Sequence, residues 1–397
     1  MDDRPGYSFD PGPPPEASAY FQNRGLRPSF SWEDFEPSEH ATAFTVAKAM
    51  NLDVLEAIQT SLQEAIDEGI PFQQWQRELT PRLQALGWWG RDELTDPLTG
   101  ELREVQLGSA RRLRTIYRAN LRTARAAGQW DRIQRTKRSL PYLVYLLGPS
   151  IKHRPQHEAK EGLVLPVDDP FWAQWFPPNG WGCKCHVRQI TRREAESRGV
   201  SESPNIPTRQ VYNSRTGELR QIPSGIDAGW ETNPGLTRQR HAEQLLAGRL
   251  DAADPEIARV AARDMATSWR VQRIHDGTAN GSVPIAMMPD ELAQALGSNT
   301  RVVRYTDYTA AKSRRYHPEA TAQTLAHIDR MLHHGTIYDR GRPNSVFVTE
   351  RRDDGLWVAV IKVTQDASEL FLSTYYRAST RYVQRNLAEG VIVRAGN

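Results

Sequence analysis

The sequence has little of what several classes of protein require. Only two of its 397 residues are cysteine, Cys183 and Cys185, and one residue separates them. Such a pair cannot supply the disulfide framework that stabilises small secreted domains. No apolar run reaches the length of about 18 residues that a transmembrane helix needs, so we expect no membrane partner. The N-terminal residues also lack the apolar core of a secretion signal.

A strong overall charge is absent as well. The chain has 51 Lys and Arg against 48 Asp and Glu, which leaves a formal net charge of +3 at pH 7. A balance so close to zero does not by itself indicate a nucleic-acid partner. The charge is nevertheless uneven, because residues 111–138 contain ten Arg or Lys and one acidic residue, Asp131.

The chain does contain enough apolar and aromatic residues for packed domains. Its hydrophobic share is 39%, and its 11 tryptophans are costly to leave in water. A length of 397 residues suffices for roughly two or three domains.

Helical periodicity dominates the first part of the chain, and turn-forming residues interrupt it. Residues 1–30 are expected to form an extended Pro-rich arm, and residues 201–235 an irregular linker. Asp254 and Pro255 are typical of a helix start. Helices are predicted over about 45–68, 72–86, 108–137, 237–250 and 254–275. We therefore expect an α-rich N-terminal domain over residues 31–275.

The pattern changes after the turn-rich stretch HDGTANGS at residues 275–282, where we place a domain boundary. Residues 276–297 are expected to be a linker, and residues 298–397 an α+β domain with an antiparallel sheet. Its strands are predicted over 301–306, 345–349, 357–364, 370–375 and 390–394, and its helices over 319–334 and 378–388.

Soft metal ligands gather in one segment, residues 149–188, which we call the Cys/His loop. It contains both cysteines and three of the ten histidines: His153, His157 and His186. The segment is so rich in Pro, Gly and Trp that neither a long helix nor a plain strand is expected. Something must order it, and a metal ion bound by thiolate and imidazole groups is one candidate.

Two interpretations of the Cys/His loop are open at this point. A structural zinc ion could be bound by Cys183, Cys185 and His157, with His186 or His153 as the fourth ligand. Alternatively, the two thiols pack among neighbouring tryptophans, and the histidines form local hydrogen bonds. A lone Cys-x-Cys pair is less specific than paired Cys-x-x-Cys motifs.

The order of motifs in this loop resembles the head-morphogenesis family of tailed phages, of the Mu protein F type. The motifs are RPxH at 154–157, DDPFW at 168–172 and PPNGWGCxC at 177–185. The flanking motifs are HATAFTVAKAM (40–50), LGWWG (86–90) and IPSGIDAGWETNPG (222–235), so the resemblance covers roughly residues 30–275. One departure is Ser150-Ile151-Lys152-His153, where family members often carry Asp and Thr.

The resemblance implies a minor head protein that acts in head assembly or morphogenesis. It implies partners among the portal protein, the major capsid protein and the scaffold protein, and contact with packaged DNA. It also implies assembly in the host cytoplasm and a final place in the procapsid or the interior of the virion head.

The basic helix over 108–137 fits such a role in one of two ways. Its arginines could contact DNA or an acidic partner such as a portal ring, which would make binding salt-sensitive. Alternatively, they form a solvated helix face. The arginines proposed for contact are Arg111, Arg114, Arg118, Arg122 and Arg125.

Residues 298–397 resemble the barnase–EndoU–colicin–RelE-like ribonuclease fold found in phage head proteins, through RRYHPE (314–319), VAVIKVT (358–364) and FLSTYYR (371–377). The resemblance implies a metal-independent endoribonuclease acting on RNA. RNA cleavage needs a base, an acid and a cation near the phosphate. His317 would be the acid or base, Lys362 or Arg377 would stabilise the phosphate, and Ser373 and Thr374 would orient it.

Three hypotheses of function follow. The first is a phage head protein that carries a ribonuclease-like domain. The second is a ribonuclease toxin or effector as the main activity, with an inactive, binding-only domain as its alternative. The third is a zinc-supported nucleic-acid-binding module.

Overall fold

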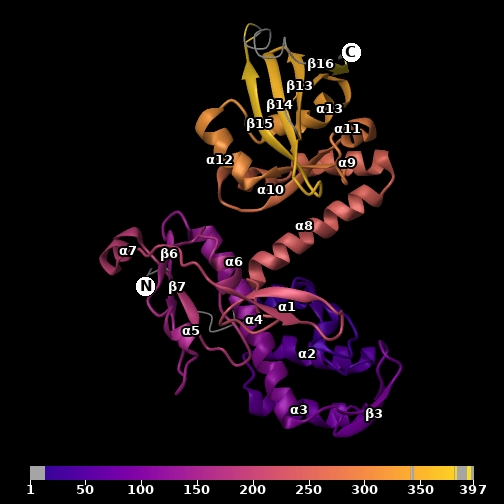
Figure 1. Cartoon of the computed structure of the whole chain (residues 1–397), viewed down its shortest axis with the longest axis vertical. Helices are drawn as coiled ribbons and strands as arrows, with labels where there is room; N and C mark the ends of the chain where they lie inside the picture. The colour runs from indigo at the N-terminus through magenta and orange to yellow at the C-terminus, as the bar shows by residue number, and fades with distance from the viewer. Residues whose placement is uncertain (1–13, 340, 342–343, 380, 382–390, 395–397) are drawn as a thin grey trace, which may run out of the picture. The chain divides into compact units, whose positions relative to one another are not determined.

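The computed structural model describes residues 14–339, 341, 344–379, 381 and 391–394 (Figure 1). The chain divides into two compact units, which we call the N-terminal unit, Met1–His241, and the C-terminal unit, Ala242–Asn397. Both mix helices with sheets, and most strand pairs are antiparallel. Within the described residues, no helix is long and apolar enough to span a membrane.

The N-terminal unit begins with a group of packed helices. Asn51 caps α2 by accepting a hydrogen bond from the Asp53 amide, and Pro71 precedes α3. Their buried residues form one core with α1 and the N-terminal half of α4. The helices are α1 (Pro15–Gln22), α2 (Leu52–Asp67), α3 (Phe72–Ala85) and α4 (Ala110–Thr136), with short η1 (Trp32–Asp34) and η2 (Glu39–Ala41).

Short strands connect these helices. Parallel strands β1 (Gly25–Leu26) and β2 (Ala43–Phe44) pair with each other, and β3 (Arg91–Thr95) and β4 (Leu102–Gln106) form an antiparallel hairpin. The long helix α4 starts at Ser109, whose hydroxyl accepts a hydrogen bond from the Arg112 amide. Leu113, Leu121 and Ala124 are buried along one stripe of α4, as its periodicity predicts.

The Cys/His loop is built around a small antiparallel sheet of order β6-β5-β7. Trp172 and Trp175 are almost fully buried beside it, in a core that also contains Tyr145 and Phe176. The elements are β5 (Tyr142–Leu146), α5 (Pro155–Glu158), β6 (Val164–Pro166), α6 (Trp172–Trp175), β7 (His186–Ile190) and α7 (Arg192–Arg198). The loop is therefore mostly irregular, as predicted, but is anchored by strands.

Three expectations for the N-terminal unit are wrong in part. The predicted extended arm contains helix α1, since Ala17, Tyr20 and Phe21 are buried on the helical core; residues 1–13 of the arm lie outside the described residues. The helix expected from Thr45 begins only at Leu52, after the Asn51 cap. The predicted linker at 201–235 contains the hairpin of β8 (Thr208–Tyr212) and β9 (Leu219–Pro223), closed by a turn around Gly217.

Helix α8 (Pro234–Ala252) crosses from the first unit into the second. The sheet of the C-terminal unit has the order β10-β11-β15-β14-β13-β12-β16, in which only β11 and β15 pair in parallel among the described residues. The strands are β10 (Ser282–Met287), β11 (Val302–Thr306), β12 (Thr336–Asp339), β13 (Ser345–Arg352), β14 (Gly355–Val363), β15 (Leu370–Ala378) and β16 (Val391–Arg394).

Helices pack on this sheet and close its core. Helices α9 and α10 contact β10, α12 contacts β11 and β15, and α13 contacts β10 and β13. Asp254 caps α9 and Pro255 is its first residue, as predicted. The helices are α9 (Pro255–Ala266), α10 (Trp269–Asp276), α11 (Asp290–Ala295), α12 (Asp307–Tyr316) and α13 (Ile328–His334), with η3 (Gln323–His327).

Several boundaries expected in this half differ from the structure. The units separate after His241 rather than at 275–282, because α9 and α10 pack on β10. The predicted linker 276–297 contains β10, whose six residues are all buried, and α11. Helix α12 was not predicted. The helix expected over 254–275 is divided into α9 and α10, and the one expected over 319–334 into η3 and α13. Residues 382–390, predicted as helix and start of a strand, lie outside the described residues.

A candidate metal centre and a cationic cavity

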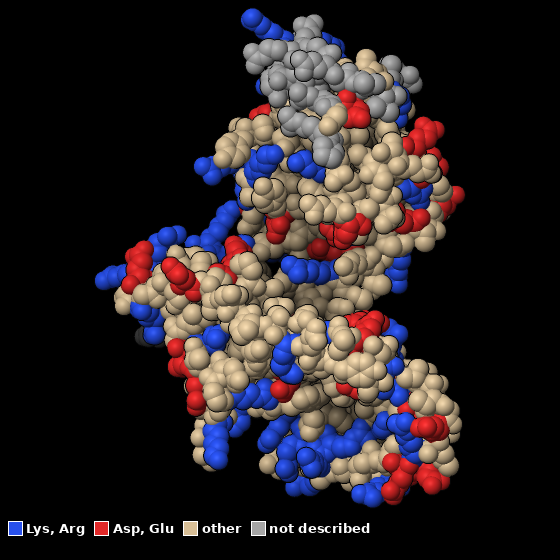
Figure 2. Space-filling model, viewed as in Figure 1, with Lys and Arg blue, Asp and Glu red and all other residues tan. Residues whose placement is uncertain are grey.

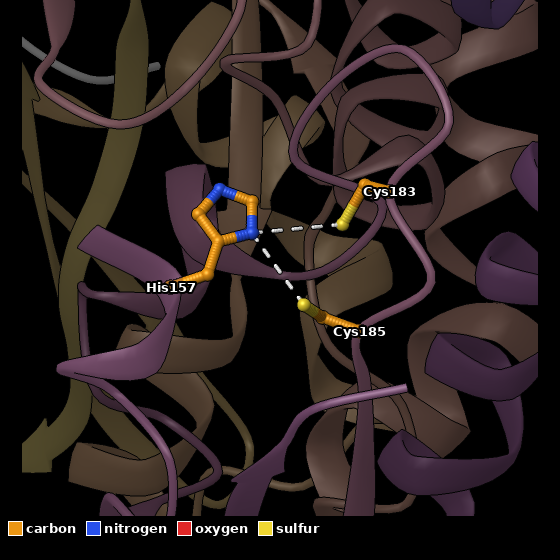
Figure 3. A group of neighbouring side chains, drawn as sticks. All are labelled: His157, Cys183 and Cys185. Carbon is orange, nitrogen blue, oxygen red and sulfur yellow. Dashed lines mark hydrogen bonds between the residues drawn. The ribbon is translucent and has the colours of Figure 1, made fainter. Parts of the chain in front are cut away.

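Three of the four predicted metal ligands meet in the Cys/His loop (Figure 3). His157 comes from α5, which Pro155 begins at its first position, and Cys183 and Cys185 precede strand β7. The Nδ1 atom of His157 lies 3.8 Å from Sγ of Cys183 and 3.4 Å from Sγ of Cys185. All three potential ligand atoms lie within 4.8 Å of one another.

The other ring nitrogen of His157 is occupied, which fixes the orientation of the imidazole. Its Nε2 lies 2.9 Å from the carbonyl oxygen of Gly225, so Nε2–H donates and the lone pair stays on Nδ1, which faces both sulfurs. Metal-bound histidines usually donate their second N–H in this way. His157 is 3% exposed and its ring packs edge-on against Trp175. The hydrogen bond to Gly225 therefore holds the imidazole in the orientation that a metal ligand needs.

The two thiols titrate as a pair. The hydrogen bond from the Cys185 thiol lowers the pKa of Cys183 to about 4, against the opposing effect of burial. The same pairing, together with burial, raises the pKa of Cys185. The first thiol proton is thus lost easily and the second is shared between the sulfurs. A cation that replaced the shared proton would hold both sulfurs as thiolates.

The two nitrogen–sulfur separations fit a tetrahedral zinc ion. Zn–S and Zn–N bonds of about 2.3 and 2.0 Å at tetrahedral angles place nitrogen and sulfur about 3.5 Å apart. The observed separations of 3.4 and 3.8 Å lie on either side of this value. Among the described residues, no fourth His, Cys, Asp or Glu joins the group. The described residues therefore offer three protein ligands to an ion.

The structure does not bring His186 or His153 to this group. His186 is exposed at the first residue of β7, where it pairs with Leu146, because side chains alternate across a strand after Cys185. The Nε2 atom of His153 lies 2.8 Å from the carbonyl oxygen of Gly148. The prediction of either residue as the fourth ligand is therefore not supported by the geometry.

The distant sequence motifs converge on the same place. Asp227, from the GID motif, accepts hydrogen bonds from Arg154 at 2.7 Å and from the Trp181 amide at 2.8 Å. Gly148 lies so close to the loop that an added Cβ would be 1.9 Å from the Lys184 carbonyl oxygen, between the two cysteines. The motifs RPxH, GWGCxC and GID thus form one structural unit.

The predicted contact arginines on α4 are of two kinds. Arg122 is half-buried and donates a hydrogen bond to the Cys183 carbonyl oxygen, so it supports the Cys/His loop. The other four are exposed, and we call them the basic face of α4: Arg111, Arg114, Arg118 and Arg125. Figure 2 shows basic side chains gathered over the region of α3 and α4.

In the C-terminal unit, four of the five residues predicted for catalysis line one cavity of about 770 Å³. His317 lies at the C-cap of α12 rather than before a helix, and its ring stacks on Tyr376 with centroids 5.0 Å apart. Lys362 comes from β14. Ser373 and Thr374, from β15, line the same cavity.

Arg377 does not line this cavity. Its Nη1 donates to the carbonyl oxygen of Asp354 at 3.1 Å, and its amide donates to Glu319 at 3.3 Å. The cavity instead contains Lys312, which the sequence reasoning missed because α12 was not predicted. One signal was available: Lys312 and Lys362 are the only lysines after residue 241.

Burial lowers the pKa of His317, and the nearby Lys312 lowers it further, against the opposing effect of Glu319, whose oxygen lies 3.8 Å from Nδ1. The imidazole is therefore mostly neutral near pH 7 and able to accept a proton. A neutral imidazole beside an ammonium group and two hydroxyls can perform acid–base chemistry on a phosphate ester.

Comparison with known proteins identifies relatives of part of the chain. The sequence model described as Phage Mu protein F like protein matches residues 56–188. The putative capsid assembly protein F of Escherichia phage Mu is 36% identical over 261 residues, which are 62% of this chain and 59% of that protein. The Mu-like prophage FluMu F protein of Haemophilus influenzae is 34% identical over 225 residues, which are 52% of this chain and 53% of that protein.

The alignments thus span less than two thirds of either relative. No solved structure matches the chain. The family match contains all three members of the metal-ligand group and the whole of α4. Residues 56–188 are therefore similar to the Phage Mu protein F-like family.

Proposed function

We propose that this protein acts in phage head assembly, as a minor head protein that joins the procapsid through its N-terminal unit. The observation that carries the proposal is the similarity of the chain to a protein named for capsid assembly, together with the family-model match to residues 56–188. The partners that fit are the portal protein, the major capsid protein or the scaffold protein, with packaged DNA close by. The protein would then act in the host cytoplasm and end in the head.

The basic face of α4 is the surface proposed for these contacts. Its arginines project from a helix that packs into the core by another stripe, so their positions are fixed by the core. A rigid row of cations suits an acidic protein surface or DNA, and binding would weaken as salt rises.

A phage that encodes this protein provides the test. Arg111, Arg114 and Arg118 are changed together to Glu, and infectious particles and DNA-filled heads are counted by plaque assay and electron microscopy. We expect a large loss of particles, while the purified variant keeps its melting temperature because these side chains are exposed. The control reverses Arg192 and Arg193, which are exposed on α7. Equal yields from both variants would contradict a contact role for α4.

We also infer that the Cys/His group binds a structural zinc ion. The orientation of His157 and the thiol spacing support this inference. His157, Cys183 and Cys185 would hold the ion, which would tie α5 to the loop before β7. The bound ion supplies a crosslink between these segments. Metal analysis of purified, chelator-washed protein should find about one zinc per chain, and less than about a tenth of that would contradict the inference.

A second candidate function is metal-independent cleavage of RNA by the C-terminal unit. The observation that favours it is the shared cavity of His317, Lys362, Ser373 and Thr374, with Lys312 added. His317 would move a proton to or from the reacting oxygens, and the lysines would stabilise the charge that develops on the phosphate.

The full chain should cleave RNA in the presence of EDTA. His317→Ala should lower the rate by about 100-fold or more, because a positioned acid or base contributes at least that much. His334→Ala is the matched control, since His334 is exposed and outside the cavity. Intact RNA with the wild-type chain over a range of pH would exclude this activity and leave the domain as a binding module.

A further inference from the structure

The C-terminal unit contains lysine only at one cavity. Lys312 on α12 and Lys362 on β14 are its two lysines, and both line the cavity that contains His317. The remaining permanently cationic side chains after residue 241 are arginines. Two compact ammonium groups, from different elements, line the same cavity. This arrangement indicates a binding site rather than a general surface charge.

Among the described residues, no carboxylate forms an ion pair with either lysine of this cavity, and Glu319 lies beside His317 instead. The Lys312 ammonium donates to the Ser373 carbonyl oxygen at 3.3 Å and to the Thr374 hydroxyl, which are neutral acceptors. No Asp or Glu is among the described residues that line the cavity. Burial and the nearby Lys362 charge both lower the pKa of Lys312. A pair of like charges held together in this way is unfavourable unless an anion binds between them.

The chemistry of the walls narrows the class of anion. The hydroxyls of Ser373 and Thr374 and the two ammonium groups suit phosphate oxygens. The rings of Phe347 and Tyr376 add aromatic surface beside them. A cavity of about 770 Å³ has room for much more than one phosphate group. Cations that follow a backbone, with aromatic rings beside them, are typical of sites for single-stranded nucleic acid.

We propose that this cavity binds a segment of single-stranded nucleic acid, with Lys312 and Lys362 contacting phosphate oxygens. The proposal deepens the ribonuclease function by adding Lys312 to the site, and rests on that function for the reaction that follows binding. Binding itself requires neither a 2′-hydroxyl nor turnover, so it is testable separately.

Lysine acetylation of the full chain gives a readout at each site. The chain is treated with an acetylating reagent, with and without a 12-nucleotide single-stranded DNA, in EDTA, and modification is measured by mass spectrometry. We expect the oligonucleotide to reduce acetylation of Lys312 and Lys362 several-fold, and to leave that of Lys160 unchanged. Because each lysine is read separately, binding of DNA to α4 does not obscure the result. Unchanged acetylation of Lys312 and Lys362 at saturating oligonucleotide would overturn the proposal.

A parallel arm contains inorganic phosphate instead of DNA. Protection by millimolar phosphate together with protection by the oligonucleotide supports a phosphate contact within a strand. Protection by phosphate alone, with none by the oligonucleotide, would overturn the strand proposal, because the site would then take only a small anion.

Substitutions test the same contacts through affinity. Each lysine is replaced in turn, by Lys312→Met or Lys362→Met, and DNA binding at the cavity is read from protection of the lysine that remains. Either substitution should weaken this binding by about tenfold, the usual effect of losing one charge-assisted hydrogen bond. The salt dependence of that binding should become less steep by about 0.7 per lost contact. Arg263→Met on α9 removes one exposed charge outside the cavity and should change neither quantity. Equal effects of Arg263→Met and the lysine variants would overturn the proposal.

The outcomes separate binding from cleavage. Protection by DNA without any cleavage of RNA supports this site and excludes the ribonuclease function. Cleavage of RNA without protection of either lysine supports the ribonuclease function and overturns the assignment of Lys312 and Lys362.

Discussion

The proposed zinc ion should stabilise the N-terminal unit by a predictable amount, which is lost when the metal is removed. His157 and Cys183 are 26 residues apart in sequence, so a bound ion closes a loop of that length. For a crosslink that closes such a loop, chain entropy gives about 3.5 kcal/mol of stabilisation. Tight binding gives a similar stabilisation, because a ligand whose free concentration is 100 to 1,000 times its Kd stabilises a fold by about 2.7 to 4.1 kcal/mol. For a unit the size of Met1–His241, this corresponds to a fall in Tm of roughly 7–14 °C.

Thermal unfolding of the full chain with and without a strong chelator measures this difference. His157→Gln should lose the metal and show the lower Tm without chelator, because it removes one of the three ligands. His186→Gln is the matched control: its imidazole is exposed and outside the group, so it should keep both the metal and the higher Tm. The transition of the C-terminal unit should not move.

Two results would refute the reasoning. One is a Tm that changes by less than about 1 °C on chelation in protein that contains metal, since the crosslink would then have no effect on stability. The other is loss of metal from His186→Gln but not from His157→Gln, because the ligand set would then differ from the one that the geometry indicates.

Further predictions concern close packing and lysine titration. Gly148→Ala should cost roughly 1–3 kcal/mol of stability in chemical denaturation and lower the zinc content, because the added Cβ would meet the Lys184 carbonyl oxygen. Gly248→Ala is the control: its added Cβ would have no atom within 4 Å, so it should be neutral or stabilising. Because the pKa of Lys312 is lowered from 10.5, the acetylation of Lys312 in the free protein should rise with pH through a midpoint below that value. Lys362→Met removes the like charge and should raise this midpoint. A midpoint that Lys362→Met leaves unchanged would contradict the proximity of the two amines.

Periodicity identified the elements that carry a strong local signal. Helices α3 and α4 and strands β11, β13, β14 and β15 lie close to the predicted ranges, because amphipathic spacing and capping residues are read directly from neighbouring residues. The missed elements have weak local signals. Strand β10 is buried on both faces and shows no alternation. Helix α12 is short, and it is stabilised by contacts with β11 and β15.

The candidate sites divide in the same way. Residue type and motif order singled out His157, Cys183 and Cys185, since few chemistries need two thiols and an imidazole in one loop. They could not decide about His186, which directly follows Cys185 but points elsewhere on a strand. The register of β7 made that decision.

The sequence by itself determined three features: the motif order of the Cys/His loop, the long basic helix, and the absence of a disulfide framework. These properties depend on residue identity and local spacing. Tertiary structure alone decided which groups meet. Gly225 reaches His157 across 68 residues, and Lys312 reaches Thr374 across 62. Contacts at such separations arise from the packing of whole elements, which local sequence patterns do not contain.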